Sequence, residues 1–200
     1  MLRVSKSLVA ILGVGLLTLA PAFAQTATWN IDPNHSAAQF TVRHMVISNV
    51  TGSFTKVSGT VEFNEKDITQ SQVSASIDVS SVDTRVAPRD ADLRSDHFFD
   101  VPKYPTIDFK SKRITSSGGK TQLIGDLTMH GTTREITLDV DGPTPEIIDS
   151  WGNQRRGFSA TGSLNRKDYG LTWNNMLKTG EAVVGDIVKL QLDVEMTKKK

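Results

Sequence analysis

Alternation of apolar and polar residues with a period of two is the feature of this chain that most constrains its fold. The longest uninterrupted example places apolar side chains at Val188, Leu190, Leu192, Val194 and Met196. The same alternation recurs at residues 38–42, 73–79, 123–129 and 136–140. Successive side chains of a strand point to opposite faces, so this period predicts strands with one apolar and one solvated face. Such strands favour an all-β, antiparallel arrangement.

The pattern predicts about eight to ten short strands, which leaves a sandwich or a closed barrel as the architecture. Periodicity alone does not choose between them. Ser58 and Gly59 predict a tight turn between two strands, and residues 142–156 form the longest predicted loop. The composition shows no break, so residues 25–200 are expected to form one domain.

The N-terminal segment is predicted to be a signal peptide, residues 1–24. Arg3 and Lys6 precede an apolar run over residues 8–19, and a small-x-small cleavage site follows at residues 22–24. The run is shorter than the ~20 residues that a membrane-spanning helix needs. A periplasmic or secreted location is therefore expected, with no integral membrane segment.

Charge and cysteine content exclude several classes of protein. Removing residues 1–24 removes two basic residues and no acidic one, so the formal net charge of +1 becomes −1. A near-neutral chain offers no general field for nucleic acid. The chain contains no cysteine, which excludes disulfides, a thiol nucleophile and a zinc–thiolate site.

One stretch, residues 88–105, departs from the alternation. Pro88 suits the first turn of a helix, and a short helical segment near residues 88–97 is predicted. Asp90 and Arg94 stand four apart and are expected to pair on one face. Prolines 102 and 105 forbid further helix. Because this segment interrupts a β chain, it is interpreted as a lid or a plug at one barrel end, with three apolar side chains facing the interior: Leu93, Phe98 and Phe99.

No motif argues for catalysis, a metal or a cofactor. The four histidines are His35, His44, His97 and His130, and no two have the spacing of metal ligands. No catalytic residue is therefore predicted. An enzyme acting on a small apolar substrate, with His35 or His44 as acid or base, remains an alternative, as does an interaction module with a solid core.

The inward phase of the strands predicts which side chains meet inside the fold. In a sandwich they fill a core, whereas in a barrel they line a cavity for one apolar ligand. The small residues Ala38, Ala75, Gly125 and Ala160 fall on the same faces and are expected to leave room. The predicted ligand contacts are Phe40, Val42, His44, Phe54, Ile77, Val79, Leu127, Met129, Phe158 and Trp173. Among these, His44 and Trp173 are the two placed near a polar head.

Ordered motifs along the chain resemble the YceI-like family. The best match is Asp90-x-x-Leu93-Arg94-Ser95-x-x-Phe98-Phe99-Asp100 with Lys103-Tyr104-Pro105. Further matches are Trp29-x-Ile31-Asp32-Pro33-x-His35-Ser36, Gly125-Asp126-Leu127-Thr128-x-x-Gly131 and Asn165-Arg166-x-Asp168-Tyr169-Gly170.

This resemblance implies an extended, lipocalin-like antiparallel barrel that holds a long-chain lipid, typically a polyisoprenoid. It also implies a periplasmic carrier rather than an enzyme, with a polyisoprenoid or fatty-acyl chain as partner. A homodimer is one oligomeric state that the sequence leaves open.

Overall fold

The computed structural model describes residues 26–199. The predicted signal peptide lies outside these residues. Within them one α-helix, α1 (Ala87–Arg94), accompanies the strands, and no helix is long and apolar enough to cross a membrane. The strands are β1 (Thr26–Ile31), β2 (Ala37–His44), β3 (Ser48–Phe54), β4 (Val57–Asn64), β5 (Gln72–Asp78), β6 (Val82–Asp83), β7 (Thr106–Ser117), β8 (Lys120–Met129), β9 (Thr132–Asp141), β10 (Ile147–Ile148), β11 (Gln154–Asn165) and β12 (Val184–Lys198).

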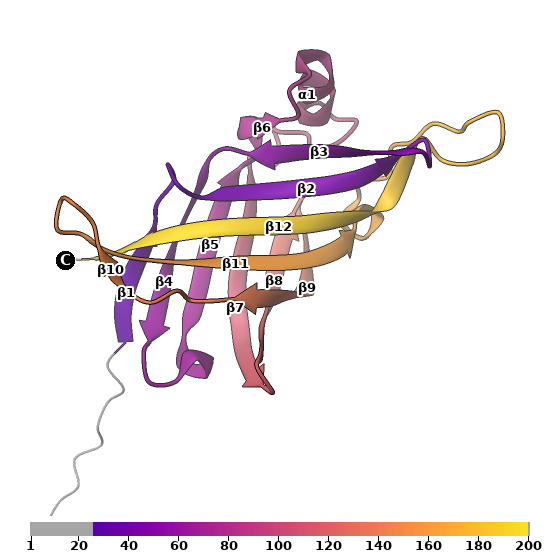
Figure 1. The fold of residues 1–200 in the computed structure, drawn as a ribbon. Helices are drawn as coiled ribbons and strands as arrows, with labels where there is room; N and C mark the ends of the chain where they lie inside the picture. The colour runs from indigo at the N-terminus through magenta and orange to yellow at the C-terminus, as the bar shows by residue number, and fades with distance from the viewer. Residues whose placement is uncertain (1–25, 200) are drawn as a thin grey trace, which may run out of the picture.

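Strand β12 closes the sheet into a barrel, because it pairs with β11 along one edge and with β1 along the other. The closed ring of antiparallel strands within residues 26–199 runs β1–β4–β5–β7–β8–β9–β11–β12. Strands β2, β3 and β6 extend this ring from the same edge of β12 that β1 uses. The predicted antiparallel barrel is thus confirmed. Figure 1 shows β2, β3, β11 and β12 crossing β4, β5, β7 and β8 at a steep angle.

The inside of the barrel is filled at one end and hollow at the other. A cluster around Trp29, Phe63 and Met196 fills the end where β1 meets β12, and these side chains are almost fully buried. Along the rest of β12 the inward side chains from Val188 to Val194 are only half-buried. Because their polar neighbours in the sequence face outward, this residual exposure is toward the interior.

Two predicted connections differ in the structure. Strands β3 and β4 do not pair with each other, and the break between them falls at Thr55 and Lys56 rather than at Ser58 and Gly59. Gly59 lies inside β4, where a Cβ atom would stand 2.3 Å from the carbonyl oxygen of Ser74. Close approach of two strands, not a turn, therefore requires this glycine. The predicted loop 142–156 contains β10, which pairs with the start of β11.

The predicted helix is present as α1, over residues 87–94 rather than 88–97, and lies outside the barrel beside β6 (Figure 1). The predicted Asp90–Arg94 pair is wrong, because each side chain binds the preceding segment instead. Asp90 Oδ1 accepts hydrogen bonds from the backbone N–H and the hydroxyl of Thr84. Arg94 donates to the carbonyl oxygens of Ser80 and Val82. Hydrogen bonds between these two helix residues and the segment 80–84 therefore hold the helix against the barrel.

The turn between β2 and β3 carries two strained residues. Met45 has φ 49° and Val46 has φ 63°, a left-handed conformation that costs an L-residue roughly 1–2 kcal/mol. Val46→Gly removes this cost, offset in part by the greater freedom of glycine in the unfolded chain. We expect a gain of about 1 kcal/mol in the free energy of unfolding, measured in urea. Val46→Ala keeps a Cβ and should gain less, and equal stability of the two variants would contradict the expectation.

Candidate functional site

An apolar cavity occupies the hollow end of the barrel. About 190 Å³ of it is open to the centre of a water-sized sphere. In the same measure one water molecule needs only ~10–15 Å³, so the space is suited to a larger guest. Among the described residues that line it, Gln39 and Arg166 are polar and all others are apolar. Such a lining favours an apolar guest over a polar one.

Most of the sequence-predicted contacts meet in this cavity. Of the predicted contacts, seven strand residues line it: Phe40, Val42, Phe54, Ile77, Leu127, Met129 and Phe158. Phe98 and Phe99, from the segment interpreted as a lid or plug, line it as well.

Four predicted residues are not among those lining the cavity. Val79 lies beyond the end of β5 in a 3₁₀ turn, where the strand alternation stops, and is buried in the core. His44 is the last residue of β2 and pairs with Val184 and Ser48. Trp173 packs against the rings of His97 and Phe98. Leu93 packs against the buried core from α1.

Other lining residues were missed although the same phase rule identifies them. The inward residues of β12 contribute Val188, Leu190, Leu192 and Val194, from the longest alternation in the chain. Strands β7 and β9, which flank β8, add Phe109 and Ile136 by the same rule. Arg166 carried no such signal, because it lies in a 3₁₀ turn, η3 (Arg166–Tyr169), outside any alternating run.

The small residues have two different roles. Ala38, Ala75 and Ala160 line the cavity and leave room in it. Gly125 does not, because the ring of Phe109 occupies the space beside it. A Cβ on Gly125 would stand 2.5 Å from that ring. The expectation that Gly125 leaves room for a guest is therefore wrong.

Aromatic rings connect the segment after α1 to the cavity. The ring centroids of Phe40 and Phe54 are 5.7 Å apart, and those of Phe54 and Phe99 are also 5.7 Å apart with an edge-on geometry. Edge-on and tilted pairs at this distance are favourable. Gly52 permits the packing, since a Cβ there would lie 2.4 Å from the ring of Phe40. The cavity wall and the segment 95–104 thus share one aromatic cluster.

Among the described residues that line the cavity, Arg166 is the one that carries a charge, and it is 3% exposed. Its guanidinium donates hydrogen bonds to four carbonyl oxygens, those of Leu171, Trp173, Val184 and Gly185. Burial lowers the pKa of Arg166, and the nearby carboxylate of Asp186, 3.6 Å away, opposes this shift. Its donors are used on the protein's own main chain, so Arg166 anchors the segment 171–185 rather than recognising a charged guest.

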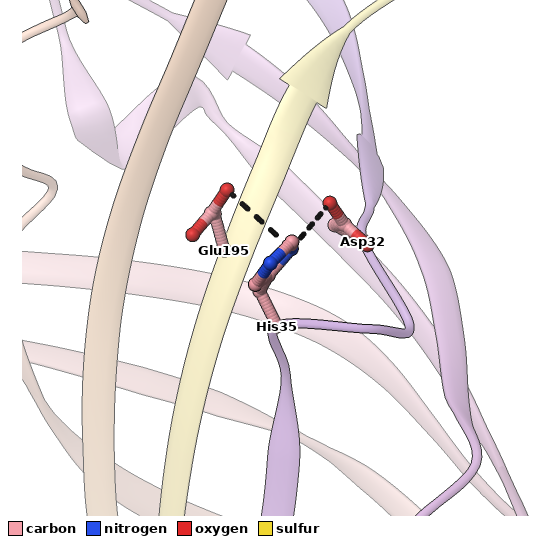
Figure 2. Close-up of side chains that lie close together, drawn as sticks. All are labelled: Asp32, His35 and Glu195. Atoms are coloured by element: carbon pink, nitrogen blue, oxygen red, sulfur yellow. Dashed lines mark hydrogen bonds and ion pairs between the residues drawn. The ribbon is translucent and has the colours of Figure 1, made fainter. Parts of the chain in front are cut away.

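His35 lies in a separate cluster of titratable groups in the turn between β1 and β2. Figure 2 shows it between Asp32 and Glu195. His35 Nδ1 is 2.9 Å from Asp32 Oδ2 and 3.9 Å from Glu195 Oε1, and its side chain is 58% exposed. None of these three residues is among those that line the cavity. The cluster therefore places no acid or base beside a guest in the barrel.

Arg155 satisfies the acidic groups of this cluster. The ligand atoms of Asp32, His35 and Glu195 lie within 4.8 Å of one another, a spacing compatible with a metal ion. However, Arg155 donates from Nη1 to both Asp32 and Glu195, and from Nε to Asp149. Its guanidinium already supplies the positive charge, so the cluster is an ion-pair network that joins the turns after β1 and β10 to β11 and β12.

The network makes stability depend on pH. The hydrogen bond with His35 lowers the pKa of Asp32 from 3.8 to about 2, and the same bond raises the pKa of His35 above 6.5. A lowered carboxyl pKa stabilises the fold above pH 3.8, and this contribution is lost as pH falls toward 2. A raised histidine pKa stabilises below pH 6.5, and this contribution is lost as pH rises through the raised value.

We therefore expect the contribution of this pair to be largest between about pH 4 and 6.5. Asp32→Asn should lower the urea midpoint most in that window and less at pH 8. Urea unfolding at pH 3, 5 and 8 measures this. Asp141→Asn, an exposed carboxylate at the end of β9, is the control and should show no such window. A loss that is equal at pH 5 and pH 8 would contradict the assignment.

Comparison with known proteins agrees with this architecture. The YceI-like domain model matches residues 29–196. A UPF0312 protein of Vibrio parahaemolyticus is 37% identical over 171 residues, which cover 82% of this chain and 87% of that protein. BcnA of Burkholderia cenocepacia has a similar fold, with a TM-score of 0.71 at 22% identity over 82% of this chain and 98% of that one.

A second similar structure is described as a polyisoprenoid binding domain from Saccharophagus degradans. It superimposes with a TM-score of 0.63 at 16% identity and covers 88% of this chain and all of the other. At this identity the likeness concerns the fold. The match of the family model over almost the whole described chain, together with the 37% identical relative, leads to one conclusion. The chain belongs to the YceI-like family.

Proposed function

We propose that the protein is a periplasmic lipid-binding protein that holds a polyisoprenoid or similar long apolar chain inside its barrel. The observation that carries this proposal is the cavity lining, in which every described residue except Gln39 and Arg166 is apolar. Arg166 is engaged with main-chain carbonyls, so the cavity offers little to a polar guest. The description of the Saccharophagus degradans domain as polyisoprenoid binding supports the same ligand class.

Apolar burial is the driving force in this proposal. Each Å² of apolar surface removed from water contributes roughly 25 cal/mol, so a chain of many methylenes binds without polar contacts. No free charged donor is present among the described lining residues. We therefore expect the protein to select its ligand by the length and shape of the apolar chain rather than by the headgroup. Catalysis is not part of the proposal, since neither His35 nor His44 lines the cavity.

Extraction of the protein recovered from its own cells tests the proposal. Organic solvent should release a prenyl or acyl lipid in about equimolar amount, identified by mass spectrometry. Cell fractionation and the N-terminal residue of the recovered chain test the location and the predicted cleavage after Ala24. A delipidated chain that takes up neither a prenyl nor an acyl chain would overturn the lipid-binding assignment.

Leu93 distinguishes a lid from a plug. It joins α1 to the buried core without lining the cavity. If the segment acts as a lid, Leu93→Ala should accelerate lipid release several-fold more than its loss of unfolding free energy accounts for. Stopped-flow transfer of a fluorescent prenyl analogue and urea unfolding measure the two quantities. If stability falls while the release rate stays unchanged, the segment is a plug.

A further inference from the structure

Exposed apolar side chains gather at the end of the barrel where the cavity lies. The turn between β2 and β3 presents Met45, Val46 and Ile47, and Ile47 is 78% exposed. The neighbouring loop 171–183 presents Met176, which is 66% exposed. Figure 1 shows both tips at the same end, opposite β10. The two tips therefore place large apolar side chains in water, and groups of exposed apolar side chains mark interaction sites.

The two tips form one ordered surface. The backbone N–H of Met45 donates to the carbonyl oxygen of Val183 at 2.7 Å. Met176 pairs with Ala182, and Leu177 N–H donates to the carbonyl oxygen of Glu181 at 2.8 Å, so the loop folds back as a hairpin. The left-handed backbone at Met45 and Val46 keeps two large apolar residues at a tip where glycine or asparagine is usual. This turn therefore carries two exposed apolar side chains on a strained backbone.

This surface continues into the cavity. Val184, which follows the loop directly, lines the cavity, and Arg166 fastens Leu171 and Trp173 at the other end of the same loop. The ring of Trp173 lies 5.1 Å from that of Phe98, which also lines the cavity. The loop that carries Met176 is therefore part of the wall that separates the cavity from solvent.

Positive charge flanks the apolar tips. Arg43, two residues before Met45, and Lys178, two residues after Met176, are exposed and form no ion pair within residues 26–199. Two acidic residues lie near them, of which Asp186 is paired with Lys167 and Arg166, whereas Glu181 has no ion-pair partner in the described chain. The unpaired charge directly beside the tips is thus two positive groups, Arg43 and Lys178, and one negative group, Glu181. Basic residues around apolar side chains complement an anionic membrane surface.

We propose that Met45, Val46, Ile47 and Met176 form a membrane-docking surface that enters the headgroup region of an anionic bilayer. This inference rests on the proposed function, because a barrel that carries a water-insoluble chain has to collect it from a membrane. Docking through these tips brings the loop 171–183, and with it the cavity wall, against the lipid that supplies the guest. The contact is shallow and reversible, since it uses a few side chains rather than a spanning segment.

Vesicle flotation tests the surface. The probes are vesicles of phosphatidylethanolamine and phosphatidylglycerol at 3:1 and vesicles of phosphatidylcholine alone, with the chain that begins at Gln25. We expect binding to the anionic vesicles to be the tighter of the two and to weaken with salt. The double variant Ile47→Ser/Met176→Ser should bind at least tenfold more weakly. The matched control is Ile148→Ser, which removes a side chain that is 71% exposed at the opposite end, and it should bind like the parent.

Two results would overturn the docking surface: no flotation of the parent chain, or an equal loss in the Ile148→Ser control. Equal binding to both vesicle compositions would show that the basic residues beside the tips do not contribute to docking. A second measurement separates this inference from the proposed function. Uptake of a prenyl alcohol added from ethanol should be unchanged in the double variant. A chain that takes up this alcohol but ignores vesicles refutes docking alone, whereas a chain that binds vesicles but takes up no alcohol refutes the lipid-carrier assignment.

Discussion

Ala75→Phe should abolish lipid binding while leaving the barrel folded. Ala75 lies on β5, lines the cavity and is half-buried. A phenyl ring at this position would extend into the volume that the proposed guest uses. Since an aromatic side chain buries about 150–250 Å², the guest loses contact area on the same scale. We expect affinity for a prenyl alcohol to fall at least ~100-fold, about 2.7 kcal/mol.

The stability of the Ala75→Phe variant separates blocking from unfolding. A ring that enters existing space removes a cavity instead of overpacking a core, so the free energy of unfolding should change by less than about 1 kcal/mol. Ser74→Phe is the matched control, because Ser74 is the exposed neighbour on the outer face of β5. It should bind the prenyl alcohol as the parent does. Normal binding by Ala75→Phe would show that the guest lies elsewhere.

Arg166→Ala should be among the most destabilising substitutions in the chain. Its removal leaves the carbonyl oxygens of Leu171 and Trp173 without their buried donor, and leaves Lys167 as the ion-pair partner of Asp186. Each buried carbonyl oxygen left without a donor costs about 1–3 kcal/mol, so we expect a loss of at least about 3 kcal/mol in the free energy of unfolding. Urea unfolding measures this loss. Hydrogen exchange over residues 171–185 should rise first, because Arg166 fastens that segment.

Two further variants identify the cause. Arg166→Lys should restore little of the stability, because one ammonium group cannot reach four carbonyl oxygens in the fork geometry of a guanidinium. Lys167→Ala removes the exposed partner of Asp186, 3.0 Å away, and should cost less than about 1 kcal/mol. A similar loss in the Arg166→Ala and Lys167→Ala variants would assign the effect to the ion pair with Asp186 rather than to the main-chain contacts.

Much of the fold could be predicted because the period-two pattern is local. The alternation from Val188 to Met196 identifies β12 and its inward face, and β12 is the strand that closes the barrel. Which strands pair with each other was harder to predict from the sequence. Gly59 resembles a turn residue in the sequence, and only the approach of β5 shows why a glycine is needed inside a strand. Tertiary proximity, not local preference, determines that position.

Only some of the residues that line the cavity could be predicted from the sequence. Inward phase identifies wall residues such as Phe40 and Leu127, but it fails where a strand ends, as at Val79 and His44. Phase also cannot say whether a small residue leaves empty space or accommodates a neighbour. Gly125 accommodates the ring of Phe109, whereas Ala75 leaves space. Arg166 has no periodic signal, because its partners are carbonyl oxygens brought to it by the fold.

A crystal structure of the delipidated chain with a prenyl alcohol tests the central claim most directly. We expect one continuous apolar chain inside the barrel, in contact with Phe40 from β2, Ala75 from β5 and Leu190 from β12. The same experiment with Ala75→Phe should show a phenyl ring and no bound chain. An empty barrel in the parent, or an alcohol bound only on the outer face of the sheet, would contradict the account.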